Sequence, residues 1–138
     1  MVQEKTILHI DDDPDDLFIF RMAMEELGIG HKLYQEDNAL RALHALQQQA
    51  AHDHPGLIVV DLNMPVLSGK DFLAHLKKHP SLHRVPVIVF TTSSLATDRQ
   101  YCLDHGAKCL TKPSLFGDMR NTVRDMLHYQ KEAGFTTY

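Results

Sequence analysis

The sequence predicts an α/β fold in which five parallel strands and five helices alternate in a doubly wound sheet. Short apolar, β-branched runs without polar alternation recur along the chain, as in strands buried on both faces. Between these runs, apolar residues repeat every three or four positions, as on one face of a helix. This alternation favours a sheet covered by helices on both sides, with functional residues beyond the carboxyl ends of its strands.

The expected strands are short. Strong apolar runs predict inner strands, and weaker runs predict two further ones. In chain order the five strands are expected at Thr6–Ile10, Lys32–Glu36, Leu57–Val60, Val85–Phe90 and Lys108–Thr111.

The expected helices each carry one apolar face. These faces are Leu17, Phe20, Met24 and Leu27; Leu40, Leu43 and Leu46; Phe72, Leu73 and Leu76; and, in a closing helix from Leu115 to Tyr129, Met119, Val123, Met126 and Leu127. Pro14 suits the first turn of the first helix, and Gly28 and Gly30 suit its end. Pro80 is expected to stop the third helix.

Composition indicates one folded domain. The chain has 138 residues, 43% of them apolar and 23% charged, which is enough to bury a core. We expect a single domain with its core at about residues 5–130, a short tail and no output domain.

Charge and hydropathy exclude several partners. The formal net charge is −4 and no basic block is present, so nucleic acid and membrane surfaces are not expected partners. The longest apolar runs are far shorter than the roughly 18 residues that cross a bilayer. Three aspartates at 11–13 interrupt any secretory signal, and the two cysteines form no disulfide framework. A cytoplasmic protein is therefore expected.

Chemically capable residues stand where the expected strands end. Asp11 and Asp12 follow the first strand, Asp61 the third, Thr91 the fourth and Lys112 the fifth. A single aspartate at such a place is more often a helix cap or turn residue. Five such residues converging on one sheet edge are a much rarer coincidence, so the set predicts a functional site.

The expected cluster suits a metal ion and a phosphoryl group. Carboxylates about 4 Å apart repel by about 4 kcal/mol at an effective dielectric constant near 20, so the cluster requires a cation. Mg²⁺ binds one or two carboxylates together with water and phosphate oxygens. Lys112 would add a compact positive charge, and Thr91 a hydroxyl donor.

Four segments of the chain resemble the receiver domain of two-component response regulators. They are Ile7–Asp13, Val59–Pro65, Phe90–Thr91 and Thr111–Pro113, with Gly69 in its expected place after the second. The resemblance covers nearly the whole chain. It implies the flavodoxin-like strand order 2-1-3-4-5 and a signalling switch that is phosphorylated, rather than an enzyme that turns over a substrate.

The resemblance also implies a role for each site residue. Asp61 would accept a phosphoryl group from a phosphohistidine on a sensor histidine kinase or phosphotransfer protein. The Mg²⁺ ligands would be Asp12, Asp61 and the backbone carbonyl of Asn63, with Asp11 acting mainly through a metal-bound water. Thr91 and Lys112 would bind phosphoryl oxygens, and the site would support self-phosphorylation and autodephosphorylation.

Three alternative interpretations fit the sequence less well. A phosphatase of the haloacid dehalogenase type needs an acid two residues after its nucleophile, where this chain has Asn63. A receiver-shaped module that docks a partner without phosphorylation would need none of the charge cluster. His75 and His79 stand four residues apart on one helix, but without a third ligand they favour a solvated face over a zinc site.

The chain also departs from the receiver pattern. Receivers commonly carry an aromatic residue three positions before the lysine, and this chain has Cys109 there. We therefore expect the signal to leave through Thr91, the loop Thr92–Ala96 and the fourth helix.

Two finer expectations concern partners. Thr92 and Ser93, with the segment Leu82–Pro86, resemble a subgroup of stand-alone receivers that includes phytochrome-associated ones, which implies a phytochrome-type kinase. A homodimer is expected through the fourth and fifth helices, whose face carries Arg99, Tyr101, Asp104, Arg120 and Arg124.

Overall fold

The sheet has the predicted order. The computed structural model describes residues 5–114 and 118–135, and five parallel strands pair as β2-β1-β3-β4-β5. Their bounds are β1 Ile7–Ile10, β2 Leu33–Glu36, β3 Leu57–Val60, β4 Val87–Thr91 and β5 Lys108–Thr111. The predicted α/β class, strand count and strand order are confirmed.

The fourth strand begins later than predicted. Val85 closes a short 3-10 segment, and Pro86, which has no N–H to donate to a ladder, precedes the strand. Pro86 nevertheless accepts a hydrogen bond from the Ile58 N–H through its carbonyl (3.0 Å). The strand then runs one residue further than predicted and includes Thr91.

Five α-helices join the strands. They are α1 Pro14–Glu26, α2 Ala39–Gln48, α3 Gly69–Lys78, α4 Ala96–Asp104 and α5 Met119–Gln130, followed by a π-helical turn at Lys131–Phe135. Short 3-10 segments lie at Gly30–Lys32, Ala51–Asp53 and Leu82–Arg84. The predicted start of the closing helix at Leu115 lies outside the described residues.

Side chains cap the first three helices. Asp13, Asn38 and Ser68 accept hydrogen bonds from backbone N–H groups in the first turns of α1, α2 and α3, respectively. The residue before α4 is Leu95, whose side chain makes no such bond. The start of α4 therefore depends on other contacts, which lie close to the candidate site.

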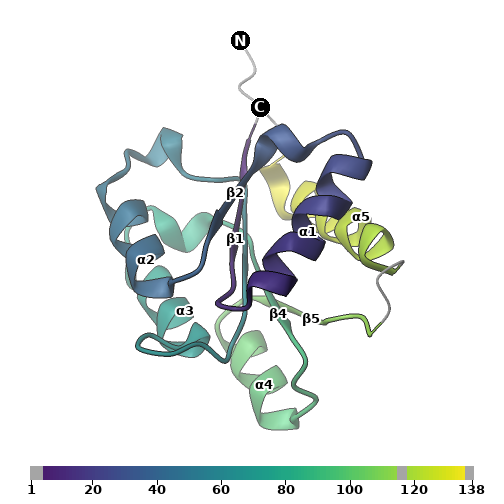
Figure 1. The fold of residues 1–138 in the computed structure, drawn as a ribbon. Coiled ribbons are helices and arrows are strands. Elements are labelled where there is room, and N and C mark those ends of the chain that lie inside the picture. Colours follow the sequence, from purple (N-terminus) through teal and green to yellow (C-terminus); the bar gives the residue numbers. More distant parts are fainter. Residues whose placement is uncertain (1–4, 115–117, 136–138) are drawn as a thin grey trace.

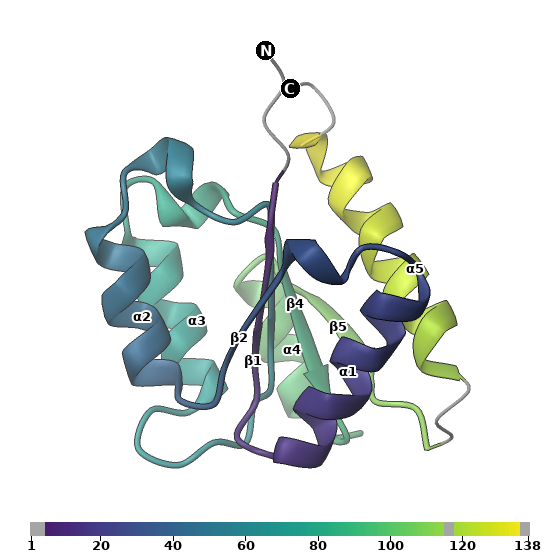
Figure 2. The same cartoon turned by 45° about the horizontal axis from the view of Figure 1, so that its top comes forward.

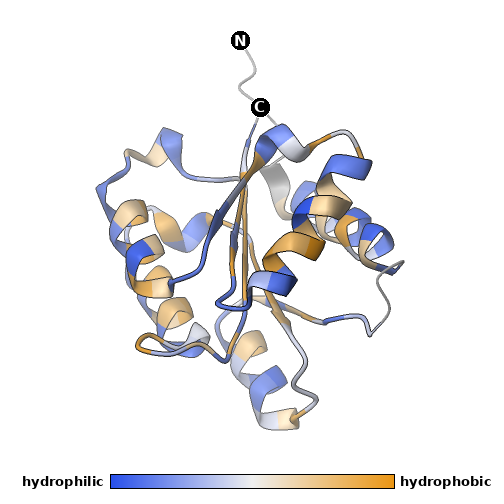
Figure 3. Ribbon diagram, viewed as in Figure 1, coloured by the Kyte–Doolittle hydropathy of each residue, from blue (hydrophilic) through white to orange (hydrophobic). Residues whose placement is uncertain are grey.

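Helices cover both faces of the sheet (Figures 1 and 2), with α1 and α5 on one side and α2 and α3 on the other. Two buried clusters fill these interfaces. Phe20, Met24 and Val123 belong to the first cluster, whereas Leu43, Phe72 and Cys102 belong to the second. Figure 3 shows apolar residues along the central strands, whereas the edge strand β2 is largely polar.

The buried face of α2 differs from the predicted one. Leu43 and Leu46 are buried as expected, but Leu40 is exposed, and Ala39 and Ala42 complete the buried face. Leu40 stands one residue after Ala39, about 100° further around the helix, which turns it away from the sheet. The prediction for Leu40 was wrong because leucine spacing alone favoured it over the smaller alanines.

The histidine of β1 is a core residue. His9 is buried, its ring stacks on Phe20 with centroids 4.1 Å apart, and its Nδ1 lies 3.1 Å from Gln35 Nε2. Burial lowers the pKa of His9 to about 3, so the ring is neutral at neutral pH.

Among the described residues, no helix is both long and apolar enough to span a membrane.

Candidate functional site

Backbone hydrogen bonds bring the strand ends together at the carboxyl edge of the sheet. The Asp61 N–H donates to the carbonyl of Ile10 (3.2 Å), which sets the end of β3 beside the end of β1. The Lys112 N–H donates to the carbonyl of Thr91 (2.9 Å), which sets the end of β5 beside the end of β4. Residues up to 101 positions apart in the chain therefore meet at one place.

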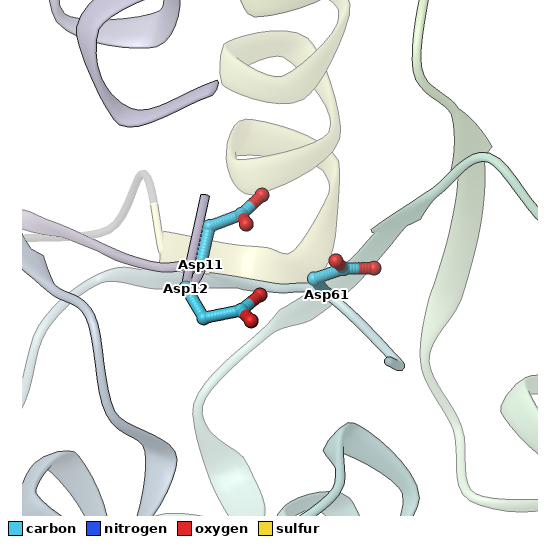
Figure 4. A group of neighbouring side chains, drawn as sticks. All are labelled: Asp11, Asp12 and Asp61. Atoms are coloured by element: carbon cyan, nitrogen blue, oxygen red, sulfur yellow. The ribbon is translucent and has the colours of Figure 1, made fainter. Parts of the chain in front are cut away.

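Three carboxylates gather there. Asp11, Asp12 and Asp61 each present an oxygen, and these oxygens lie within 4.8 Å of one another (Figure 4). Asp11 and Asp61 are buried and Asp12 is exposed, so the cluster has a closed inner side and an open outer side. The structure thus brings together the three aspartates that the sequence predicted.

Lys112 is the cation of this cluster. Its ammonium lies 2.7 Å from Asp11 Oδ2 and 3.4 Å from Asp61 Oδ2, and its side chain is 10% exposed. Burial alone lowers the pKa of Lys112, but hydrogen bonds to Asp11 and Asp16 outweigh it and raise the pKa above its usual value. Lys112 is therefore charged at neutral pH and offsets part of the carboxylate repulsion.

Asp16 is a site residue that the sequence analysis missed. Its Oδ2 lies 2.7 Å from Lys112 Nζ, the same distance as Asp11 Oδ2. In the sequence, Asp16 is an acid in the first turn of a helix, a frequent position near the positive end of the helix dipole. Only its distance to Lys112 in the folded chain separates it from its neighbours Asp13 and Asp15.

Burial shifts the pKa of Asp11. It raises the pKa of Asp11 to about 6, although the hydrogen bond from Lys112 opposes the shift. Asp11 also accepts a hydrogen bond from the Asp13 N–H (3.0 Å), which fixes the carboxylate at the turn after β1. A dication at the cluster would remove the electrostatic penalty on this ionised group.

Thr91 ends β4 next to Lys112 and is fully buried. Its hydroxyl oxygen accepts a hydrogen bond from the Ser93 N–H (3.1 Å). The hydroxyl is thus bonded to the loop that precedes α4. The structure places Thr91 at the predicted edge of the sheet.

The loop between β3 and α3 holds Asn63, which is exposed two residues after Asp61. The loop closes with a hydrogen bond from the Gly69 N–H to the Leu62 carbonyl (2.9 Å). A Cβ at Gly69 would overlap the Asp61 carbonyl, so only glycine allows this approach. Val66, in the middle of the loop, has φ 68°.

The other residues that the sequence singled out lie elsewhere. His75 is exposed on α3, whereas His79 ends that helix and its Nδ1 accepts hydrogen bonds from the N–H groups of Ser81 and Leu82. His79 therefore has a structural role, in line with the preference against zinc. Cys109, on β5, is partly exposed.

The donor set fits a hard dication. The carboxylates of Asp11, Asp12 and Asp61 offer oxygens at close range, and the open side at Asp12 leaves room for water and phosphate oxygens. Mg²⁺ prefers this combination of few carboxylates and several exchangeable oxygens. These three residues are therefore the ones that would hold it.

Comparisons with known proteins agree with this geometry. A family model of the response regulator receiver domain matches residues 7–124. Response regulator Rcp1 of Synechocystis sp. is 37% identical over 124 residues, which cover 87% of this chain and 84% of that protein.

Two solved structures are similar along nearly their whole length. The phosphorylated cyanobacterial phytochrome response regulator RcpA has a TM-score of 0.83 and 25% identity, covering 96% of this chain and 97% of that one. The Mn²⁺-bound form of Rcp1 has a TM-score of 0.79 and 32% identity, covering 91% and 94%. A divalent cation is thus bound in the solved structure of a relative with the same fold.

Proposed function

The chain belongs to the receiver domains of response regulators, and we propose that its Asp61 accepts a phosphoryl group from a phosphohistidine. The protein is a response regulator of two-component signalling, and receiver domains interact with histidine kinases or phosphotransfer proteins. The observation that carries the proposal is the cluster of Asp61 with Asp11, Asp12 and Lys112 at one sheet edge.

The chemistry is an in-line displacement. An oxygen of the Asp61 carboxylate attacks phosphorus, the phosphorus–nitrogen bond of the donor breaks, and the imidazole leaves with that electron pair. Mg²⁺, when bound, supplies positive charge to the phosphoryl oxygens and to the carboxylates. Catalysis is then mainly positioning and electrostatic stabilisation, which the backbone bonds at the strand ends provide.

Lys112 and Thr91 would receive the phosphoryl oxygens. The Lys112 ammonium already lies 3.4 Å from Asp61 Oδ2, so little movement is needed to contact an oxygen added there. Thr91 presents a buried hydroxyl at the end of the neighbouring strand. Asn63 supports the proposal through its backbone carbonyl, which would complete the Mg²⁺ ligands. Small phosphodonors would use the same residues for self-phosphorylation, and water would use them for autodephosphorylation.

A hydrogen-bond network leads from Thr91 to α4 and α3. The Ser93 N–H donates to Thr91 Oγ1, and the Ser93 hydroxyl donates to Asp98 Oδ2 (2.5 Å). Asp98 Oδ1 lies 2.7 Å from Lys70 Nζ, and the Tyr101 hydroxyl donates to the Lys70 carbonyl (2.8 Å). We call these five residues the Thr91 network.

The Thr91 network supports an exit route for the signal through α4. A phosphoryl group would accept a hydrogen bond from the Thr91 hydroxyl and draw Thr91 Oγ1 toward itself, which would lengthen the bond from the Ser93 N–H. Because Leu95 makes no side-chain cap, Ser93 and Asp98 supply side-chain contacts that hold the start of α4. Movement of Thr91 would therefore reach α4 without an aromatic residue at position 109.

The similar proteins support a more specific proposal about the partner kinase. RcpA is described as a phytochrome response regulator, and its similarity along nearly the whole chain supports a phytochrome-type kinase as the partner here. We also infer that the 138 residues act as one receiver domain in the cytoplasm and bind no nucleic acid directly. A homodimer through α4 and α5 belongs to the same proposal.

Phosphorylation with a small donor tests the proposal. Acetyl phosphate with Mg²⁺ should add one acid-stable, hydroxylamine-labile phosphoryl group, detected by intact mass. EDTA or Asp61→Asn should abolish it. Asp53→Asn, which changes an exposed aspartate near the opposite edge of the sheet, should leave it intact. Phosphorylation that persists in Asp61→Asn would exclude Asp61 as the acceptor and leave the phosphorylation-independent docking module as the better interpretation.

A further inference from the structure

The two cysteines of the chain lie against each other across α4 and β5. Cys102, in the last turn of α4, is fully buried in the cluster that α2 and α3 share with the sheet. Cys109, the second residue of β5, packs against the same cluster and is partly exposed. The Cys109 sulfur faces α4, because Arg99, one turn before Cys102 on that helix, donates a hydrogen bond to it. The thiols of this chain are therefore neighbours with unequal access to solvent.

The backbone between the two cysteines holds this arrangement. The Ala107 N–H donates to the Cys102 carbonyl (2.9 Å), and Gly106, at φ 69°, makes the sharp turn from α4 into β5. Strand alternation then directs Cys109 to the side of α4, while Leu110 packs into the cluster on the other face. Figure 1 shows α4 and β5 as consecutive elements at one end of the sheet.

The two sulfurs differ in burial and in access to solvent. Burial and the nearby Cys109 raise the pKa of Cys102 to about 12, so Cys102 is a protonated thiol that solvent reagents do not reach. Cys109 is accessible, and the Arg99 guanidinium lies beside it, with Nη1 3.8 Å from Sγ. A thiol-reactive molecule would therefore meet Cys109 first, with Cys102 behind it.

We propose that Cys109 and Cys102 form a redox-active pair that small-molecule disulfides oxidise to an intramolecular disulfide between β5 and α4. The Cys109 sulfur, after losing its proton to solvent, attacks one sulfur of the small disulfide and releases the other as a thiolate. The Cys102 sulfur then loses its proton and attacks Cys109, releasing the second thiolate. Two protein thiols are oxidised and one small disulfide is reduced to two thiols.

This modification does not depend on phosphorylation of Asp61. It would tie the end of α4 to β5, close to Arg99, which also donates to Thr111 Oγ1 (2.7 Å) beside the site. The cross-link would restrict the helix that the Thr91 network reaches. The pair also gives Cys109 a role at the position where receivers commonly carry an aromatic residue.

Intact mass spectrometry tests the proposal on the full chain. The reduced protein is incubated with glutathione disulfide, denatured, and alkylated with iodoacetamide. Wild type should be a monomer that is lighter by two hydrogen atoms and carries no alkyl group. Cys102→Ala should stop at a glutathione adduct on Cys109, because the resolving sulfur is absent. Cys109→Ser should take no glutathione and be alkylated once after denaturation.

Circular dichroism is used first to check that both variants are folded. If one variant is not folded, the result for wild type decides whether the proposal holds. Two alkyl groups on oxidised wild type, a stable glutathione adduct on wild type, or a disulfide-linked dimer would each overturn the proposal.

Discussion

At the scale of single residues, the loop between β3 and α3, beside the site, contains a residue with an unfavourable backbone conformation. Val66 has φ 68° and is 84% exposed, so a β-branched residue occupies the left-handed region with little packing in return. Such a conformation costs about 1–2 kcal/mol for an L-residue other than glycine. The loop keeps it because Gly69 and Ser68 hold the loop end at the start of α3.

Val66→Asn should therefore stabilise the protein. Asparagine tolerates positive φ better than valine does, so the free energy of unfolding should rise by about 1 kcal/mol. Chemical denaturation measures it. Val66→Ala, which removes the branch but keeps the unfavourable φ, is the matched control and should gain less. An unchanged or lower stability in Val66→Asn would show that the loop conformation costs nothing.

His54 makes stability depend on pH. Burial lowers the pKa of His54, and His79 and Lys5 add to the shift. The unfolded chain therefore takes up a proton near its usual pKa of about 6.5 before the folded chain does, so stability is lost as pH falls below that value. Its neutral ring is held between Ser81 Oγ (2.8 Å from Nε2) and Gln49 Oε1 (3.3 Å from Nδ1).

His54→Gln should flatten this pH dependence. Between about pH 7 and about pH 5, the variant should lose less unfolding free energy than wild type, as followed by urea denaturation. His44→Gln, which changes an exposed histidine of α2, should keep the wild-type slope. Parallel slopes in His54→Gln and wild type would contradict the assignment.

At the scale of elements, α4 begins differently from α1, α2 and α3. α1, α2 and α3 each have a side-chain cap, whereas α4 depends on Asp98, which accepts from Ser93 and pairs with Lys70. The bonds from Lys70 and Ser93 lower the pKa of Asp98, which keeps it ionised at neutral pH. A helix anchored through a loop that also bonds Thr91 is suited to respond to events at the site.

Amide hydrogen exchange of the loop and of α4 tests this route. Beryllofluoride, an analogue of the phosphoryl group, should speed exchange of the Ser93 and Leu95 amides in reduced wild type, because Thr91 turns toward the added group. Asp98→Asn should show faster exchange before beryllofluoride is added. Thr91→Ala should still be phosphorylated but lose the beryllofluoride response.

Cys109→Ala is the control for the alternative route through β5. It should keep the response of wild type, with coupling to a bound partner changed by less than about 1 kcal/mol. A lost response in Cys109→Ala together with an intact one in Thr91→Ala would reverse the proposed route.

At the scale of the whole molecule, the face of α4 and α5 remains the expected dimer surface. Several polar groups predicted on it already have partners within the chain: Arg99 bonds Thr111, Tyr101 bonds Lys70, and Arg120 pairs with Glu26. The large exposed apolar residue of α4 is Leu103, at 68% exposure. An apolar contact around Leu103 is thus a better basis for association than the charged residues.

Light scattering at micromolar concentration measures this association. We expect a dimer that Leu103→Glu weakens, with and without beryllofluoride. Val66→Glu, which places the same charge on an exposed apolar residue of the β3–α3 loop, should leave the dimer intact. A monomer in every condition would exclude the homodimer.

Local patterns were sufficient for most of the fold. Apolar runs without alternation located the inner strands, and the register of strand ends placed Asp11, Asp61, Thr91 and Lys112 at one edge. Both signals depend on neighbours in the chain and on the rule that parallel strands end on the same side. Where two patterns competed, as at Leu40, residue type alone gave the wrong face.

Other features of the site depend on contacts between side chains of different elements, which only the tertiary structure shows. Asp16 joins the site, Asp98 anchors α4, and Cys102 meets Cys109, each through a side chain on a different element from its partner. No periodicity encodes such pairs, because they depend on where a helix lies on the sheet and how far it is rotated. The burial that raises the pKa of Asp11 arises in the same way, from packing that exists only in the folded chain.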